Sequence, residues 1–254
     1  MKVFVMHYKP LIERKKSIIN LLKELKLDGQ FILDFDREEI EELYKNYDVN
    51  HSLWKKQLQL TKNVFLKNKT NKINNLKDFI KDKYQSYLSK VFTPKWMLPR
   101  KLSLSEISLT LKHLSALKQI SKLNEPALII EDDVIIKPIT KELIEKAFVL
   151  CKQKYDYVDL GGGCNLPLFK NDKQIKIYEN FIDLNIPRSR TTAAYMINAK
   201  AANIIAKNLT PIVMPIDWQL QYLFLKYNFR VAWAIPPAFI HGSESIFTTT
   251  IEKS

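Results

Sequence analysis

The sequence has only two cysteines, Cys151 and Cys164, and five glycines among its 254 residues. Two cysteines cannot form a disulfide framework, and no Cys-x-x-Cys pair is present, so we expect two reduced thiols. No segment approaches the roughly 20 apolar residues that span a bilayer. The apolar start at residues 1–7 is too short for a signal peptide and has no small-residue cleavage site, so a cytoplasmic protein is expected.

The few glycines do not follow the spacing of either familiar phosphate-binding loop. Neither Gly-x-Gly-x-x-Gly nor the Gly-Lys-[Ser/Thr] ending of a P-loop occurs, which leaves both motifs unsupported. Three glycines form the run Gly161 to Gly163, which directly follows an expected strand in the sequence. Glycines at a strand end let a ligand approach the backbone closely. The same run is equally typical of a tight turn.

The formal net charge of +13 is concentrated in one segment. Residues 51–101 contain 13 Lys or Arg and 2 Asp, a local charge of 13 − 2 = +11. A basic stretch of this kind favours an anionic partner, which could be a membrane surface, a charged glycan or nucleic acid. A solvated lysine-rich face is the alternative. Nucleic acid is the least favoured partner because no nucleic-acid fold signature is present.

Hydrophobic periodicity predicts that strands and helices alternate along most of the chain. Strands are predicted at residues 2–6, 31–35, 126–131, 155–160, 191–197 and 231–235. Helices are predicted at residues 11–25, 103–122, 141–151, 199–208 and 218–227. Gly29 is expected to stop the first of these helices. The alternation predicts an α/β fold with a mostly parallel sheet flanked by helices.

Residues 37–101 interrupt this alternation. Their pattern predicts helices at residues 38–47, 53–66 and 73–91, followed by a loop at 93–99. We interpret the segment as a basic helical insertion within a single domain of residues 1–254. Its aromatic side chains are expected to form a small core of the insertion's own.

The most informative motif is an apolar strand, residues 127–130, that ends in Glu131, Asp132 and Asp133. A buried strand ending in carboxylates can hold a divalent cation, because Mg²⁺ and Mn²⁺ prefer oxygen ligands. Charges beside a core strand are costly without a partner, which also favours a bound group. A solvated strand end is the alternative.

Two other residues, Asp217 and His241, allow both a structural and a chemical interpretation, and Glu106 has a structural one. Asp217 lies at an expected helix start, where it could cap the helix or act as a general base. His241 follows the last predicted strand, where it could complete a metal site with Asp133 or be an ordinary loop histidine. Glu106 lies three residues after Ser103, as in a capping box.

Taken in order, these segments resemble glycosyltransferase family 25, which includes lipooligosaccharide galactosyltransferases and collagen galactosyltransferase domains. The resemblance covers about residues 1–35 and 102–242. Within it, Lys112 stands where the family pattern has Ser, and His7 where it often has Asn. The similar segments are residues 3–14, 102–113, 127–134, 159–162, 191–198 and 215–217.

The resemblance implies a GT-A-type fold and a metal-dependent, inverting transfer of a sugar to a hydroxyl of a glycan or glycolipid. The donor would be a UDP-sugar, often UDP-galactose, bound with Mn²⁺ or Mg²⁺. Asp133 would be a direct metal ligand and His241 a further one. Glu131 or Asp132 would reach the ribose or a metal-bound water, and Asp132 is also included as a metal ligand.

Further roles follow from the same resemblance. Arg14 would pair with the nucleotide or with a nearby carboxylate. Asp217 would be the general base, with Glu106 as a second catalytic candidate. The remaining donor-binding candidates are Gly161, Gly162 and Tyr195.

Two other functions remain open at this stage. The first is a catalytically silent family member that binds a glycan or an anionic membrane through the basic insertion, at the membrane periphery. The second is a nucleic-acid-binding protein, whose binding would weaken steeply with salt.

Overall fold

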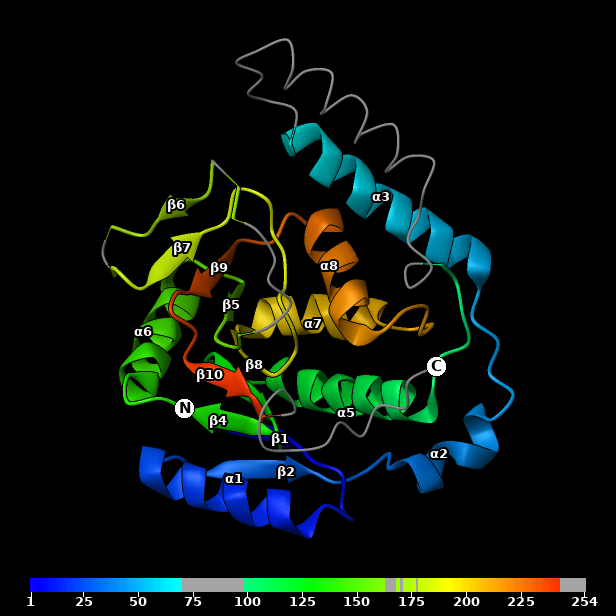
Figure 1. Cartoon of the computed structure of the whole chain (residues 1–254), viewed down its shortest axis with the longest axis horizontal. Helices are drawn as coiled ribbons and strands as arrows, with labels where there is room; N and C mark the ends of the chain where they lie inside the picture. Colours follow the sequence, from blue (N-terminus) through cyan, green and yellow to red (C-terminus); the bar gives the residue numbers. More distant parts are fainter. Residues whose placement is uncertain (70–97, 163–167, 170, 177, 243–254) are drawn as a thin grey trace.

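The computed structural model describes the chain except for residues 70–97, 163–167, 170, 177 and 243–254. Strands and helices alternate along most of the chain (Figure 1). In chain order the elements are β1 (Val3–Met6), α1 (Ile12–Leu25), β2 (Gly29–Ile32), α2 (Arg37–Tyr44), α3 (His51–Lys69), α5 (Leu104–Ile120), β3 (Ala127–Glu131), β4 (Val134–Ile136), α6 (Thr140–Gln153), β5 (Tyr157–Asp159), β6 (Lys173–Gln174), β7 (Phe181–Asp183), β8 (Ala194–Ile197), α7 (Ala199–Asn208), α8 (Ile216–Lys226), β9 (Val231–Ala234) and β10 (Phe239–His241).

The central sheet has eight strands in the order β2-β1-β3-β8-β5-β9-β7-β6. β1 pairs in parallel with β2 and β3, and β5 pairs in parallel with β9. β8 lies antiparallel between β3 and β5, and β7 is antiparallel to its neighbours. All strands of this sheet except β7 and β8 therefore point the same way. The predicted α/β fold with a largely parallel sheet is confirmed.

Alternate residues of the strands feed two hydrophobic cores, one on each face of the sheet. Val3 and Val5 of β1 pack with α1 and α6, whereas Phe4 and Met6 pack with α5, α7 and α8. This alternation follows from the period of two of a β-strand. Because both faces are covered, β1 reads as a continuous apolar run in the sequence.

The first helix does not end at Gly29 as predicted, and the second strand begins earlier than expected. Lys26 caps α1 in the left-handed conformation, with φ of 56°, and β2 starts at Gly29 itself. A Cβ atom at Gly29 would lie 2.6 Å from Cδ1 of Leu22. The glycine is therefore explained by close helix–strand packing and not by a helix stop.

A second, two-stranded sheet was not predicted from the sequence. β4 and β10 pair antiparallel, with His241 opposite Val134. Each strand is only three residues long, which is too short for hydrophobic alternation to be recognised. This small ladder joins the last described strand of the chain to the segment that follows β3.

The described part of the segment at residues 37–101 is helical and packs against the rest of the fold. Trp54 of α3 is fully buried, and its ring lies 6.2 Å from that of Trp218 in α8. Trp54 thus belongs to the main core, and the expectation of a separate small core is wrong for this residue. The helix predicted at residues 73–91 lies outside the described residues.

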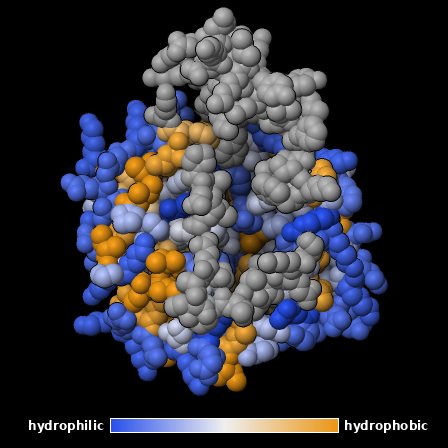
Figure 2. Space-filling model, viewed as in Figure 1, coloured by the Kyte–Doolittle hydropathy of each residue, from blue (hydrophilic) through white to orange (hydrophobic). Residues whose placement is uncertain are grey.

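Hydrophilic residues surround much of the outline of the face seen in Figure 2, and hydrophobic patches lie toward its left side. Among the described residues, no helix is both long and apolar enough to cross a membrane. The large hydrophobic side chains exposed in this part of the chain are Met1, Ile12, Leu43, Leu60, Leu98, Leu168 and Ile240.

Candidate functional site

The predicted acidic motif lies at the carboxyl end of β3. Glu131 is the last residue of that strand, and Asp132 and Asp133 form the turn into β4. Asp132 and Asp133 are 7% and 5% exposed, respectively. The motif is therefore not a solvated strand end, because its two aspartates are buried and need partners.

His241 is brought to this motif by the pairing of β10 with β4. Its Nδ1 atom lies 3.4 Å from Oδ2 of Asp133, and the next backbone N–H, that of Gly242, donates to the carbonyl of Asp133. Ligand atoms of Glu131, Asp133 and His241 all lie within 4.8 Å of one another. The structure thus joins two predicted metal ligands, Asp133 and His241, with Glu131 as the third member.

These three side chains have the chemistry of a divalent-cation site. Oδ1 of Asp133 is buried and has no hydrogen-bond partner among the described residues. Burial, together with the charge of Glu131, raises the pKa of Asp133 to about 6, although His241 and Arg14 oppose the shift. Two carboxylates and one imidazole can ligate a divalent cation, whose charge would relieve this repulsion.

Asp132 was also predicted as a metal ligand, but its side chain contacts residues outside the cluster of Glu131, Asp133 and His241. Its Oδ2 atom lies 2.6 Å from Nδ1 of His7 and accepts the backbone N–H of Tyr8 at 3.3 Å. Its Oδ1 atom accepts from Arg14 at 3.2 Å. Both oxygens are therefore engaged by the β1–α1 region, and Asp132 anchors that region beside the cluster.

Arg14 was predicted to pair either with the nucleotide or with a nearby carboxylate, and the structure shows it paired with carboxylates. Its Nη1 atom lies 3.2 Å from Asp132 and 3.6 Å from Asp133, and the residue is 7% exposed. A buried guanidinium between two aspartates offsets part of their mutual repulsion. Arg14 also lines the pocket described next, which keeps a contact with a nucleotide open.

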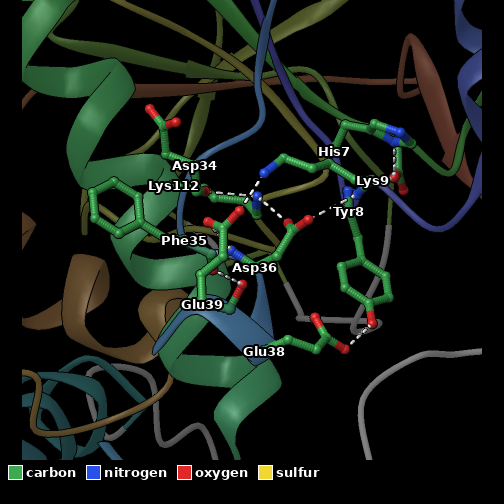
Figure 3. Close-up of polar contacts among 11 residues, drawn as sticks. His7, Tyr8, Lys9, Asp34, Phe35, Asp36, Glu38, Glu39 and Lys112 are labelled. Carbon is green, nitrogen blue, oxygen red and sulfur yellow. Dashed lines mark hydrogen bonds and ion pairs between the residues drawn. The ribbon is translucent and has the colours of Figure 1, made fainter. Parts of the chain in front are cut away.

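A first pocket opens beside the acidic cluster, between the end of β1 and one face of α5. Its lining includes Tyr8, Arg14, Arg37, Lys112, Asp133 and His241. One wall joins the β1–α1 loop to the start of α2, and Figure 3 shows Tyr8 pointing toward Glu38 there. Lys9 pairs with Glu39 beside it. The two loops at this pocket are thus held together by side-chain contacts.

Lys112 stabilises the same wall from inside the protein. Its Nζ atom lies 2.7 Å from Oδ1 of Asp36 and donates to the carbonyl of Asp34 at 2.8 Å (Figure 3). Lys112 and Asp36 are both 3% exposed. The backbone of Phe35, between the two bonded residues, has a φ of 69°. Lys112 therefore fixes an unusual loop conformation at the pocket.

A second pocket also borders the cluster and contains Asp217. It shares Leu109, Glu131 and His241 with the first pocket and adds Thr191, Thr192, Glu106 and Asp217. The cluster of Glu131, Asp133 and His241 therefore borders both pockets. Two ligands bound on either side would meet at this cluster.

Asp217 is not the N-cap of its helix. α8 begins at Ile216 after the N-cap Pro215, so Asp217 is the second helical residue. Burial and the charges of Glu131 and Glu106 raise the pKa of Asp217 to about 6, whereas backbone N–H groups at the helix start oppose the shift. A carboxylate with this pKa can accept a proton near neutral pH.

Glu106 has a structural role in the same pocket. It completes the predicted capping box with Ser103, and Arg100 donates to both of its oxygens at 2.6 and 2.9 Å. Burial would raise the pKa of Glu106, but Arg100 and Ser103 together hold it below its usual value. Such a carboxylate is a weak proton acceptor, so Asp217 is the better base of the two.

Gly161 and Gly162 do not line either pocket. Their backbone N–H groups donate to the carbonyls of Ala194 and Phe239. A Cβ atom would lie 3.3 Å from the nitrogen of Ala194 at Gly161, and 3.0 Å from Pro237 at Gly162. These glycines are explained by close chain packing, which argues against their predicted contact with a donor.

Tyr195 is also placed away from both pockets. It is 1% exposed, and its hydroxyl lies 2.9 Å from Nδ1 of His113. His113 and Thr192 both contact Glu131, and neither was assigned a role from the sequence. The signal that could have indicated them is their place in the similar segments at residues 102–113 and 191–198.

The sheet flanked by helices and the acidic cluster bordered by two pockets are consistent with a glycosyltransferase fold. The family model for glycosyltransferase family 25, described as an LPS biosynthesis protein, matches residues 1–220. The chain belongs to glycosyltransferase family 25. No curated protein matches the sequence.

The extent of the match differs from the resemblance inferred from motifs. It runs through residues 37–101, which the motifs had left out, and it includes the acidic motif and Asp217. It ends before His241, whose place in the site is given by the β4–β10 pairing. Family membership supports glycosyltransferase activity with a donor and a glycan or lipid acceptor.

Proposed function

We propose that the protein is a metal-dependent, inverting glycosyltransferase of the GT-A type, which moves a sugar from a UDP-sugar to a hydroxyl of a glycan or glycolipid. Galactose is the first candidate for the sugar. The observation that carries the proposal is the cluster of Glu131, Asp133 and His241 between two pockets. The first pocket would take the nucleotide, and the second the acceptor.

Glu131, Asp133 and His241 would hold Mn²⁺ or Mg²⁺, which stabilises the negative charge that grows on a departing diphosphate. Arg14 lies beside Asp132 and Asp133 next to the pocket, where its charge offsets part of the repulsion between these buried acids. Asp132 in turn holds His7 and Tyr8 at the pocket wall. These contacts preorganise the donor side before a ligand binds.

Asp217 would remove the proton from the attacking hydroxyl of the acceptor. It lines the second pocket, which shares Glu131 and His241 with the first, so an acceptor held there would meet the donor sugar at the cluster. Its raised pKa of about 6 makes it a stronger base than an ordinary aspartate. Direct displacement by one activated hydroxyl inverts the configuration of the transferred sugar.

The lining of the second pocket supports an uncharged hydroxyl acceptor. Its described side chains include the acids Glu106, Glu131 and Asp217 and the hydroxyls of Thr191 and Thr192, but no Lys or Arg. An anionic group placed here would be repelled by these carboxylates and by the donor diphosphate. The sugar that receives the transfer is therefore expected to carry no acidic group next to its reactive hydroxyl.

The basic segment at residues 51–101 is proposed to contact an anionic membrane surface, at which a cytoplasmic enzyme could reach a glycolipid. Its net charge of 13 − 2 = +11 supports this, because each Lys or Arg near an anionic surface contributes about 1 kcal/mol. Co-sedimentation with anionic vesicles but not with neutral vesicles is expected. Equal sedimentation with both would remove this part of the proposal.

The proposed activity is tested by release of UDP from a panel of UDP-sugars, with Mn²⁺ or with EDTA. Release from one sugar is expected with Mn²⁺ alone, and it should be lost in Asp133→Asn, which keeps the size of the side chain. Asp48→Asn, an exposed aspartate outside the site, serves as the matched control.

Absence of both UDP release and nucleotide-sugar binding in the folded protein would contradict the proposal. Glycan or vesicle binding without turnover would then identify a catalytically silent family member. Salt-sensitive binding of nucleic acid would instead support the nucleic-acid alternative.

A further inference from the structure

One carboxylate oxygen of Glu131 is held in place by two residues that were predicted neither as metal ligands nor as donor-binding residues. Oγ1 of Thr192 donates to Oε1 of Glu131 at 2.6 Å, and Nε2 of His113 lies 3.7 Å from the same oxygen. Both of these contacts reach the same carboxylate oxygen, Oε1. The Glu131 carboxylate is thereby held beside Asp133 and His241, with which it forms the cation cluster.

His113 is fully buried and is itself oriented by Tyr195. Its Nδ1 atom lies 2.9 Å from the hydroxyl of Tyr195, and the two rings stack at 5.8 Å with an interplanar angle of 13°. Nε2 of His113 has no hydrogen-bond partner within the described part of the chain. The group that this nitrogen faces is the carboxylate of Glu131.

The Tyr195 hydroxyl can act as the donor in this pair. Burial, together with the charge of Glu131, raises the pKa of Tyr195 well above its usual value, so the hydroxyl keeps its proton. If that proton is donated to Nδ1 of His113, Nδ1 is the acceptor and the ring N–H of His113 lies on Nε2. The tautomer so selected directs an N–H toward Oε1 of Glu131.

We propose that Tyr195 is a positioning residue that acts through His113 to orient Glu131 toward a divalent cation. This inference rests on the proposed metal-dependent function and replaces the donor-binding role first expected for Tyr195. Side chains that hydrogen-bond to metal ligands fix the ligands' orientation, and their loss typically costs about 10- to 100-fold in metal affinity. Tyr195 on β8, His113 on α5 and Glu131 on β3 form the connected path.

The experiment is a titration of the full chain with Mn²⁺ alone at one pH. Binding is measured by calorimetry or by electron paramagnetic resonance. Tyr195→Phe removes only the hydroxyl and keeps the ring, and its Mn²⁺ affinity is expected to fall about tenfold or more. Tyr157→Phe is the matched control. Its ring stacks on Tyr195 at 4.7 Å, but its hydroxyl faces Ser189, so the affinity should stay within about twofold of wild type.

His113→Asn provides a second, independent variant, since its shorter amide cannot replace Nε2 beside Glu131. Its Mn²⁺ affinity is expected to fall as in Tyr195→Phe. Because Tyr195 acts through His113, the double variant should bind no more weakly than His113→Asn alone. Circular dichroism at each titration temperature verifies that every variant is folded.

The outcomes separate this inference from the proposed function. Wild-type affinity in Tyr195→Phe, equal losses in Tyr195→Phe and Tyr157→Phe, or additive losses in the double variant would each overturn the positioning role alone. If the wild-type protein bound no Mn²⁺ or Mg²⁺, the proposed cation site would fail, and this inference would fail with it.

Discussion

Nδ1 of His241 lies 3.4 Å from Oδ2 of Asp133, although the two residues belong to distant parts of the sequence. The contact exists because β10 pairs with β4, directly behind the turn that holds Asp133. Neither short strand has a pattern that would reveal this pairing. The relationship makes His241 part of the acidic cluster and leads to the first prediction.

His241→Ala is expected to weaken Mn²⁺ binding at least tenfold, because it removes one of three proposed ligands. The measurement is a calorimetric titration of the folded protein with Mn²⁺. His51→Ala is the control, since His51 is exposed at the start of α3. Equal affinity in wild type and His241→Ala would exclude the histidine from the site.

Asp217→Asn is expected to lower transfer to an acceptor by about 10²- to 10⁴-fold, the usual contribution of a general base. Mn²⁺ affinity should be unchanged, because Asp217 is not a member of the cation cluster. The measurement compares transfer rates with Mn²⁺ titrations for the same preparation. A transfer rate close to that of wild type would show that another group takes the proton.

The transfer rate is expected to fall as the pH drops below about 6, by up to tenfold per pH unit. The reason is that Asp217 accepts a proton only when ionised, and its pKa is raised to about 6. The measurement is kcat against pH at saturating Mn²⁺, so that titration of Asp133 does not limit binding. A rate that stays level down to pH 5 would contradict the assignment.

Asp217→Asn is also expected to stabilise the fold at neutral pH. The folded-state pKa of Asp217 lies above the unfolded value near 4, so the carboxyl favours folding below pH 4 and loses that contribution as the pH rises through 6. At pH 7.5 without metal, the variant should be more stable by about 1–3 kcal/mol.

Urea unfolding at pH 7.5 and at pH 4 measures this difference in the free energy of unfolding. The gain should shrink at pH 4, where the aspartate is largely neutral in the folded state and only about half ionised in the unfolded state. Asp48→Asn, which changes an exposed side chain, should show no such dependence. A gain of the same size at both pH values would mean that ionisation is not its cause.

Lys112→Met is expected to destabilise the protein by about 3–5 kcal/mol, because it leaves the buried carboxylate of Asp36 without its cation. Urea unfolding provides the measurement. Lys118→Met is the matched control on the same helix, where the lysine is exposed and a change within about 0.5 kcal/mol is expected. Similar losses in both variants would refute the role given to the ion pair.

Much of the fold could be predicted from local pattern. The apolar run of β3 and its acidic end, the capping box at Ser103, and the alternation of strands and helices all occur within a few residues of one another. The direction of each strand was harder to predict, because the apolar run of β8 does not indicate that the strand lies antiparallel between β3 and β5. The β6–β7 hairpin and the β4–β10 ladder were missed because their strands are only two or three residues long.

The chemistry that is available can be read from the sequence alone: three consecutive acids at a strand end, Asp217 at a helix start and a late histidine. Which of these residues act together depends on the packing of the chain. Neighbouring residues in a turn can point to different partners, so Asp133 joins Glu131 and His241 whereas Asp132 joins His7 and Arg14. Local periodicity specifies elements, but the packing of α5, β8 and β10 around β3 sets the contacts of each carboxylate.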